Sequence, residues 1–290
     1  MILILIIIFI LIYFYKSKKY KEESYYKITK VDYFDVRYNK GKYGEYLTYK
    51  YLKRFEKQGA KFLFNIYVPK KDEETTEIDV LMISNKGIFV FESKNYSGWI
   101  FGSDNQKYWY QILPAGRRRN HKQKFYNPVF QNKTHVKYLK SLLGEIAPMH
   151  SIITFSDRCT LKNINIQNSM VKVIKRYQVY NLISSIYNNS EDYLSNEQID
   201  EIYNKLYPYT QVDEITKQKH IDSINNIKEI NNNMYTLSKK NDSIDEKKNT
   251  VETDDSINTS VIIEKETDLT TNLNDSEINI VEDNEKNKEE

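Results

Sequence analysis

The segment from Ile78 to Lys94 constrains the fold most, because it holds two apolar runs joined by Asn85-Lys86-Gly87. Two such runs with Asn and Gly between them are typical of a β-hairpin. Asp79 begins the first run, and Glu92 and Lys94 end the second. Apolar strands normally exclude charge, because an unpaired buried carboxylate or ammonium is expensive. The three charged groups therefore need an explanation.

The register of this hairpin decides whether the charges meet. A loop of two or four residues places Asp79 opposite Glu92, with their Cβ atoms roughly 5 Å apart on one face, and Lys94 follows on that face. Two carboxylates that close repel unless a proton or cation lies between them. Mg²⁺ binds one or two carboxylates together with waters and phosphate oxygens. A three-residue loop with a left-handed Gly87 would instead put Asp79 and Glu92 on opposite faces.

Helical and strand patterns alternate through the rest of the body of the chain. A helix is predicted from Gly41 to about Lys57, and Glu45 heads its inward-facing stripe. Asn127-Pro128 is a good start for a second helix, which runs to about Leu143. Further strands are expected at 61–68, 98–102, 107–113, 151–155 and 171–174, and further helices at 180–187 and 196–207. The pattern favours an α/β fold, a sheet with helices on both faces.

Several short motifs stand out in this body of the chain. They are Gly41-x-x-Gly44-Glu45, Ile78-Asp79, the strand Gly87–Lys94, Tyr96-Ser97-Gly98 and Asn127-Pro128-x-x-Gln131. Together they resemble the motifs of the nuclease-related domain family, NERD for short. The resemblance covers about residues 41–143 and continues through later strands to about residue 187. It implies a restriction-endonuclease-like mixed sheet flanked by helices, with an Asp…Glu-x-Lys nuclease core.

The resemblance implies a role for each matching residue. Asp79 and Glu92 would be ligands of Mg²⁺ or Mn²⁺, and Lys94 would position water as a base or stabilise charge. Glu45 would be a further ligand or a supporting acid, and Gln131 would orient substrate or water. The alternatives are an ordinary acid at a helix start for Glu45, a polar helix residue for Gln131, and a structural ion cluster for Asp79, Glu92 and Lys94.

Charge is divided unevenly along the chain, which carries +3 in total. Residues 1–210 sum to +13 and residues 211–290 to −10, and a basic body favours a polyanionic partner. For the basic residues between 117 and 124, a solvated loop and a contact with anionic lipid remain alternatives to nucleic-acid binding. His135, four residues after Gln131, is read as a polar neighbour on one helical face. The predicted nucleic-acid-binding residues are Arg117, Arg118, Arg119, Lys122, Lys124 and Lys133.

The two ends differ from the body in composition. Residues 1–15 carry no charge and precede a lysine cluster, which predicts an uncleaved transmembrane anchor with the rest of the chain cytoplasmic; a buried core helix is the alternative. Residues 16–38 are expected to form a polar tether and residues 39–210 the nuclease-related domain. Residues 211–290 are expected to be a disordered acidic tail, which could bind a protein partner.

The sequence therefore predicts a single-pass cell-membrane protein that hydrolyses phosphodiester bonds with a divalent metal ion. The family resemblance favours DNA over RNA as substrate. The alternative is a non-catalytic module on a nuclease fold, which binds nucleic acid or acts as a membrane scaffold.

Overall fold

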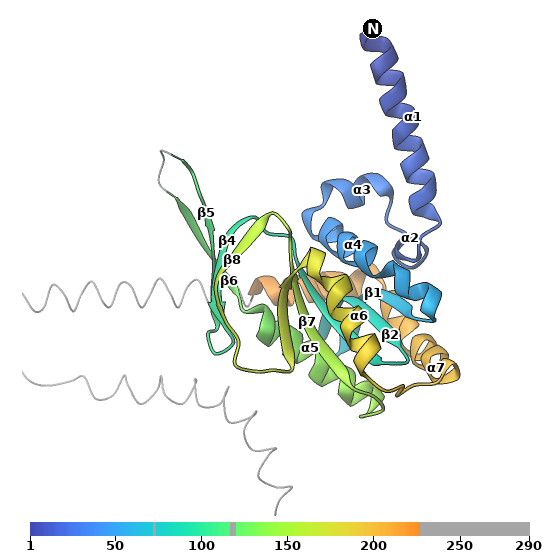
Figure 1. The fold of residues 1–290 in the computed structure, drawn as a ribbon, viewed down its shortest axis with the longest axis vertical. Coiled ribbons are helices and arrows are strands. Elements are labelled where there is room, and N and C mark those ends of the chain that lie inside the picture. Colours follow the sequence, from blue (N-terminus) through green and yellow to red (C-terminus); the bar gives the residue numbers. More distant parts are fainter. Residues whose placement is uncertain (72–73, 117–119, 227–290) are drawn as a thin grey trace, which may run out of the picture. The chain divides into compact units, whose positions relative to one another are not determined.

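The structure, a computed structural model, describes residues 1–71, 74–116 and 120–226 (Figure 1). Within these residues the chain forms a five-stranded sheet of order β1-β2-β3-β7-β9 and a four-stranded sheet of order β6-β5-β4-β8. Both sheets mix parallel and antiparallel pairs, and helices flank them. The predicted mixed α/β architecture is confirmed.

The elements follow one another along the chain with short connections. The strands are β1 Lys61–Pro69, β2 Thr75–Ser84, β3 Gly87–Lys94, β4 Gly98–Ser103, β5 Tyr108–Leu113, β6 His121–Tyr126, β7 Met149–Phe155, β8 Cys159–Asn165 and β9 Val171–Lys175. The α-helices are α1 Ile2–Lys21, α2 Ser24–Thr29, α3 Tyr33–Tyr38, α4 Lys40–Leu52, α5 Pro128–Leu143, α6 Val179–Asn189 and α7 Asn196–Leu206. The 3₁₀ helices are η1 Lys53–Gln58, η2 Arg176–Gln178 and η3 Tyr207–Thr210.

The β2–β3 hairpin has the register in which the charged residues meet. Ser84 pairs with Gly87 across a two-residue turn, and the pairing continues to Val80 opposite Phe91. The alternative three-residue loop is thereby excluded. Gly87 has φ +116°, and a Cβ there would lie 2.5 Å from the Pro148 carbonyl oxygen, so glycine is needed at this close approach.

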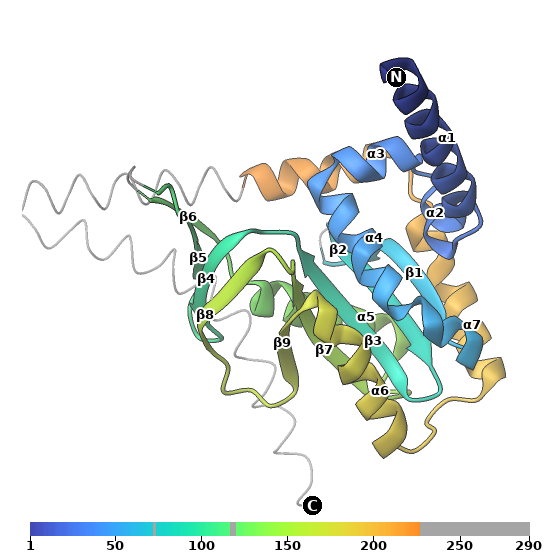
Figure 2. The same cartoon turned by 45° about the horizontal axis from the view of Figure 1, so that its top comes forward.

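Helices cover both faces of the five-stranded sheet. Figure 2 shows α4 and α6 on one side of it and α5 on the other. Side chains agree with this view, because Ser93 of β3 contacts Thr48 of α4 whereas its neighbour Glu92 contacts His135 of α5, and successive strand residues point to opposite faces. The main core lies between this sheet and its helices.

Residues 16–38, predicted as a polar tether, instead pack onto the folded body. They contribute the end of α1, α2 and α3, and bury Tyr20, Tyr25, Ile28 and Val36 in the main core. The Tyr20 hydroxyl donates a 2.7 Å hydrogen bond to the Val31 carbonyl. The prediction overlooked that tyrosine rings bury large apolar areas when each hydroxyl finds a partner.

Of the apolar residues 1–15, all but Met1 belong to α1, and most of their side chains are exposed. No helix in the described part of the chain is both long and apolar enough to cross a bilayer. The predicted transmembrane anchor is therefore not supported. Lysines occupy the last turn of α1. The apolar part of the helix is therefore shorter than the roughly 20 residues that a membrane-spanning helix needs.

Three segments have more structure than the sequence predicted. The strands β6 and β8 were not expected, because their residues are largely polar and exposed and give no apolar alternation. Residues 214–226 are helical, although the disordered tail was expected to begin at residue 211. His220 from this helix is buried, and its Nδ1 lies 3.1 Å from the Thr75 Oγ1. The rest of the predicted tail, 227–290, lies outside the described residues.

Candidate active site

Glu92 is the centre of a buried ionic cluster at the end of β3. Its side chain is 1% exposed. Lys94 Nζ lies 2.5 Å from Oε1, and His135 Nε2 lies 3.0 Å from Oε2. Burial alone would raise the pKa of the Glu92 carboxyl, but the Lys94 charge and the His135 contact outweigh it and lower the pKa. Glu92 is therefore an anion at neutral pH.

Lys94 connects this carboxylate to α5. Its ammonium donates a 2.9 Å hydrogen bond to the Gln131 Oε1. Burial would lower the pKa of Lys94, but the charges of Glu92 and Asp79 raise it above its usual range. The ammonium is therefore protonated at neutral pH and serves as a fixed positive charge.

Asp79 stands next to this cluster, one residue beyond the last strand pair of the hairpin. Its Oδ2 accepts a 2.7 Å hydrogen bond from the Ser93 N–H. Burial, and then the negative charges of Glu92 and Glu45, raise the pKa of Asp79 well above its usual range. The carboxylates are crowded, and a cation between them would relieve their repulsion.

Glu45 approaches from α4 but belongs to a separate set of hydrogen bonds. Its Oε2 accepts from the Tyr25 hydroxyl at 3.0 Å and from Asn65 Nδ2 at 3.1 Å. Burial and the nearby charge of Glu77 raise the pKa of Glu45 to about 7. Within the described residues, no hydrogen bond joins Glu45 to Asp79 or Glu92. Glu45 acts on Asp79 through its charge.

Gly44 explains why α4 comes so close to the end of β3. A Cβ on Gly44 would lie 2.9 Å from the Asn95 Cβ and 3.3 Å from both Arg176 Nη2 and Ser93 Oγ. Only glycine lets the helix backbone reach this position without displacing those neighbours. The Gly-x-x-Gly-Glu motif thus sets the depth at which Glu45 is held.

The start of α5 is anchored so that its functional face meets β3. Asn127 caps the helix by accepting a 2.9 Å hydrogen bond from the Val129 N–H. One turn further, Asn132 Nδ2 donates to the Val90 carbonyl at 3.0 Å and to Ser151 Oγ at 2.8 Å. These bonds bring Gln131 and His135, four residues apart on one helical face, against Lys94 and Glu92.

His135 was treated as a polar neighbour from sequence, but the structure makes it a direct partner of Glu92. Its second ring nitrogen, Nδ1, lies 2.6 Å from the Thr76 Oγ1. The ring therefore bridges β2 and β3 from α5 and is 2% exposed. The i, i+4 spacing from Gln131 was the available signal. Nothing in the sequence pointed to Thr76.

Two acidic residues offer the oxygen ligands expected for Mg²⁺ or Mn²⁺. No group of three or more His, Cys, Asp or Glu side chains suited to hold a metal ion occurs among residues 1–71, 74–116 and 120–226. Asp79 and Glu92 fit a magnesium ion by the type of their donors and by the crowding that raises the Asp79 pKa. Such a site needs only one or two carboxylates, with water and substrate phosphate completing it.

Three of the predicted nucleic-acid-binding residues lie on exposed elements. Lys122 and Lys124 are on β6, and Lys133 is on the outer side of α5. Lys122 Nζ lies 4.1 Å from the Tyr110 ring centre, and Lys124 Nζ lies 5.1 Å from the Tyr108 ring centre. These residues form a basic, aromatic face of the β5–β6 hairpin. Arg117, Arg118 and Arg119 lie outside the described residues.

The comparisons with known proteins show the family of the chain. A family model for the nuclease-related domain matches residues 40–156, which run from the first residue of α4 to the residue after β7. The chain belongs to the nuclease-related domain family.

A protein of Bacillus anthracis that is described as uncharacterized is 31% identical to the chain over 187 residues. The aligned part covers 64% of this chain and 84% of that protein. No solved structure matches the chain.

Proposed function

We propose that the chain is a metal-dependent nuclease that hydrolyses phosphodiester bonds in DNA, on a core like that of restriction endonucleases. The observation that carries this proposal is the buried Glu92 carboxylate, which is held between Lys94 and His135 and lies beside Asp79. Membership of the nuclease-related domain family supports nucleic acid as the substrate class.

Each side chain in the site has a distinct part in this proposal. Asp79 and Glu92 would hold Mg²⁺ or Mn²⁺, which supplies polarisation of the scissile phosphate and a water of lowered pKa. Lys94 is a fixed cation and would stabilise the negative charge that develops on the phosphate. Its raised pKa argues against a role as general base. Gln131 keeps the Lys94 ammonium in place.

Glu45 and the basic face of the β5–β6 hairpin support this chemistry from outside the cluster. The negative charge of Glu45 favours binding of a cation near Asp79. Lys122, Lys124 and Lys133 are exposed or half-exposed cations, which suit the neutralisation of backbone phosphates.

A nuclease assay on the full chain tests the proposal. Labelled single-stranded and duplex DNA and RNA are incubated with Mg²⁺, Mn²⁺ or EDTA. We expect cleavage of DNA that EDTA abolishes and that Glu92→Gln reduces at least a hundredfold. The matched control is Glu191→Gln, at an exposed glutamate far along the chain. Cleavage that persists in EDTA or in Glu92→Gln contradicts the proposal, provided that both variants melt as the wild type does.

The same cluster also favours one alternative. Both carboxylate oxygens of Glu92 already have partners, as in a structural ion cluster. If the cluster around Glu92 is purely structural, the chain would bind nucleic acid without cutting it. Binding that is retained in every condition, with no cleavage by wild type under any metal, would favour this alternative.

A further inference from the structure

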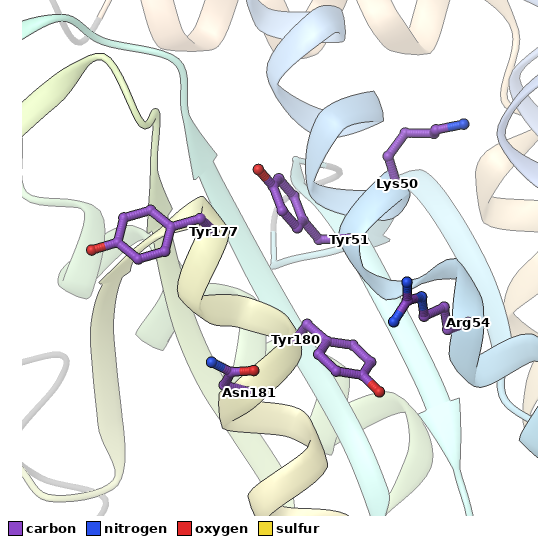
Figure 3. A pocket seen from close by; sticks show the side chains of 6 residues that line it. All are labelled: Lys50, Tyr51, Arg54, Tyr177, Tyr180 and Asn181. Carbon is purple, nitrogen blue, oxygen red and sulfur yellow. The ribbon is translucent and has the colours of Figure 1, made fainter.

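A second cluster of aromatic and basic side chains lies on the face of the sheet covered by α4 and α6. A surface pocket of about 270 Å³ opens there. Figure 3 shows its six lining side chains, which come from α4, η1, η2 and α6. They are Lys50, Tyr51, Arg54, Tyr177, Tyr180 and Asn181.

This pocket is separate from the candidate active site. Thr48, one helical turn from Tyr51, contacts Ser93 on the α4 face of β3. Glu92 and Lys94 contact α5 on the opposite face. A ligand in the pocket therefore does not occupy the acidic cluster.

The charges around the pocket favour an anion. The Arg54 guanidinium extends toward Tyr180 (Figure 3), and its carbon lies 5.1 Å from the ring centre. Lys175 Nζ lies 5.5 Å from the Tyr177 ring centre. Lys50 points away from the other lining side chains and pairs with Glu23 at 2.7 Å. Arg54 is thus the main cation of the pocket itself.

The acidic group next to the pocket is Asp157, and both of its carboxylate oxygens accept hydrogen bonds from the protein. Its Oδ2 accepts from the Tyr51 hydroxyl at 3.3 Å, and its Oδ1 accepts from the Tyr177 N–H at 3.0 Å. Behind it lies Arg176, whose side chain is 1% exposed. Its Nε donates to Thr48 Oγ1 at 3.2 Å, while its Nη2 has no hydrogen-bond partner within the described residues. This buried guanidinium interacts electrostatically with Asp157 and Tyr51, so it offsets the negative charge of Asp157 beside the pocket.

We infer that this pocket binds one nucleotide of single-stranded nucleic acid, with a base on the exposed Tyr177 ring and a phosphate on Arg54. Tyr177 is 52% exposed, and aromatic rings stack on any unpaired base. The planar guanidinium of arginine matches two phosphate oxygens at once. The volume is below the roughly 300–1,000 Å³ of pockets for larger ligands, which suits a single nucleotide. A duplex offers no unstacked base, so the pocket selects single strands or strand ends.

Fluorescence anisotropy with a labelled oligothymidylate tests this inference on the full chain in EDTA, which removes the divalent metal ions that the proposed cleavage requires. We expect Tyr177→Ala to weaken binding roughly fivefold to a hundredfold, which corresponds to the loss of one stacked base. Arg54→Gln should weaken binding and make the log–log salt dependence shallower by about 0.7. The matched controls are Lys57→Gln, at an exposed lysine in the same 3₁₀ helix, and Tyr193→Ala, at an exposed tyrosine elsewhere. Both should bind as the wild type does.

The outcomes separate this inference from the proposed nuclease activity, because binding in EDTA is measured without cleavage. Unchanged affinity in both Tyr177→Ala and Arg54→Gln overturns it. A loss of affinity in Lys57→Gln equal to that in Arg54→Gln also overturns the inference, because the loss would then come from the change in net charge. If Tyr177→Ala and Arg54→Gln bind phosphatidylserine vesicles more weakly but keep their affinity for oligothymidylate, the pocket binds lipid headgroups. That result would also overturn the inference. Duplex competition as strong as single-strand competition would contradict selection of unpaired bases.

Discussion

His135 and Glu92 meet where α5 packs on β3, with Nε2 of the imidazole 3.0 Å from Oε2 of the carboxylate. An ionised carboxylate only accepts hydrogen bonds, so Nε2 carries the proton. The other ring nitrogen contacts Thr76 at 2.6 Å, which fixes the ring orientation. The imidazole in turn fixes the carboxylate whose second oxygen binds Lys94. His135 is therefore a positioning residue for the candidate site.

Truncation of His135 should expose this dependence. His135→Ala leaves one Glu92 oxygen buried without a partner, which we expect to cost about 1–3 kcal/mol of unfolding free energy. The measurement is urea denaturation of His135→Ala, Glu92→Gln and the double variant. The double variant should lose less stability than the sum of the two single losses, because the pair acts as a unit. Additive losses would contradict a direct interaction.

The main elements could be predicted because their signals are local. The sequence left the hairpin register open between a loop of two or four residues and a loop of three. The structure has a two-residue turn at Asn85 and Lys86, and the pairing runs from Ser84–Gly87 to Val80–Phe91. This register is what brings Asp79 and Glu92 together.

The features that the sequence did not predict depend on contacts between residues far apart in the chain, which leave no local sequence pattern. The buried tyrosines of residues 16–38 look like a polar tether until their hydroxyls meet partners such as Glu45. His135 becomes important only when the cap at Asn127 and the bonds of Asn132 turn that face of α5 toward β3. The strand β6 is largely exposed and has little apolar content, so only its pairing with β5 defines it.

Divalent cations should stabilise the fold if Asp79 and Glu92 bind them. At a Mg²⁺ concentration a hundred times the dissociation constant, the unfolding free energy should rise by about 2.7 kcal/mol. Thermal melting with and without Mg²⁺ or Mn²⁺ measures this, with Asp79→Asn as the variant that loses the effect and Glu191→Gln as the control that keeps it. Equal stabilisation of Asp79→Asn and wild type would contradict the metal assignment.

The raised pKa of Glu45 gives a pH dependence of definite sign. The folded value is about 7 against 4.5 for the ordinary group, so the folded state binds more protons between these pH values. Stability should therefore fall as pH rises from about 4.5 to 7, and Asp79 acts in the same direction. The part due to Glu45 is at most about 3–4 kcal/mol.

Glu45→Gln tests this by removing the titration while keeping the shape of the side chain. Urea unfolding at pH values from 4 to 8 should show the variant gaining stability relative to wild type as pH rises through this window. Parallel pH profiles of the two proteins would show that Glu45 does not titrate there.

The basic face of the β5–β6 hairpin should contribute affinity without base selectivity. Lys122 and Lys124 lie on one face of β6 because they are two residues apart, and Tyr110 and Lys124 are paired across the strands. Lys133 presents a further charge from α5. Changing Lys122, Lys124 and Lys133 together to Gln should weaken binding to duplex DNA to a similar extent for every sequence tested. The log–log salt dependence should become shallower by about 0.9 for each phosphate contact that is lost.

A triple variant at Lys27, Lys57 and Lys219, which are exposed on other elements, removes the same charge and serves as the control. If the two triple variants lose equal affinity and equal salt dependence, the hairpin is not a specific contact surface, and net charge alone explains the binding. If the hairpin variant alone loses affinity, while Glu92→Gln keeps its affinity but loses cleavage, then binding and hydrolysis reside on separate residues. That separation follows from the structure, since the lysines are exposed or half-exposed on β6 and α5, whereas Glu92 is buried between Lys94 and His135.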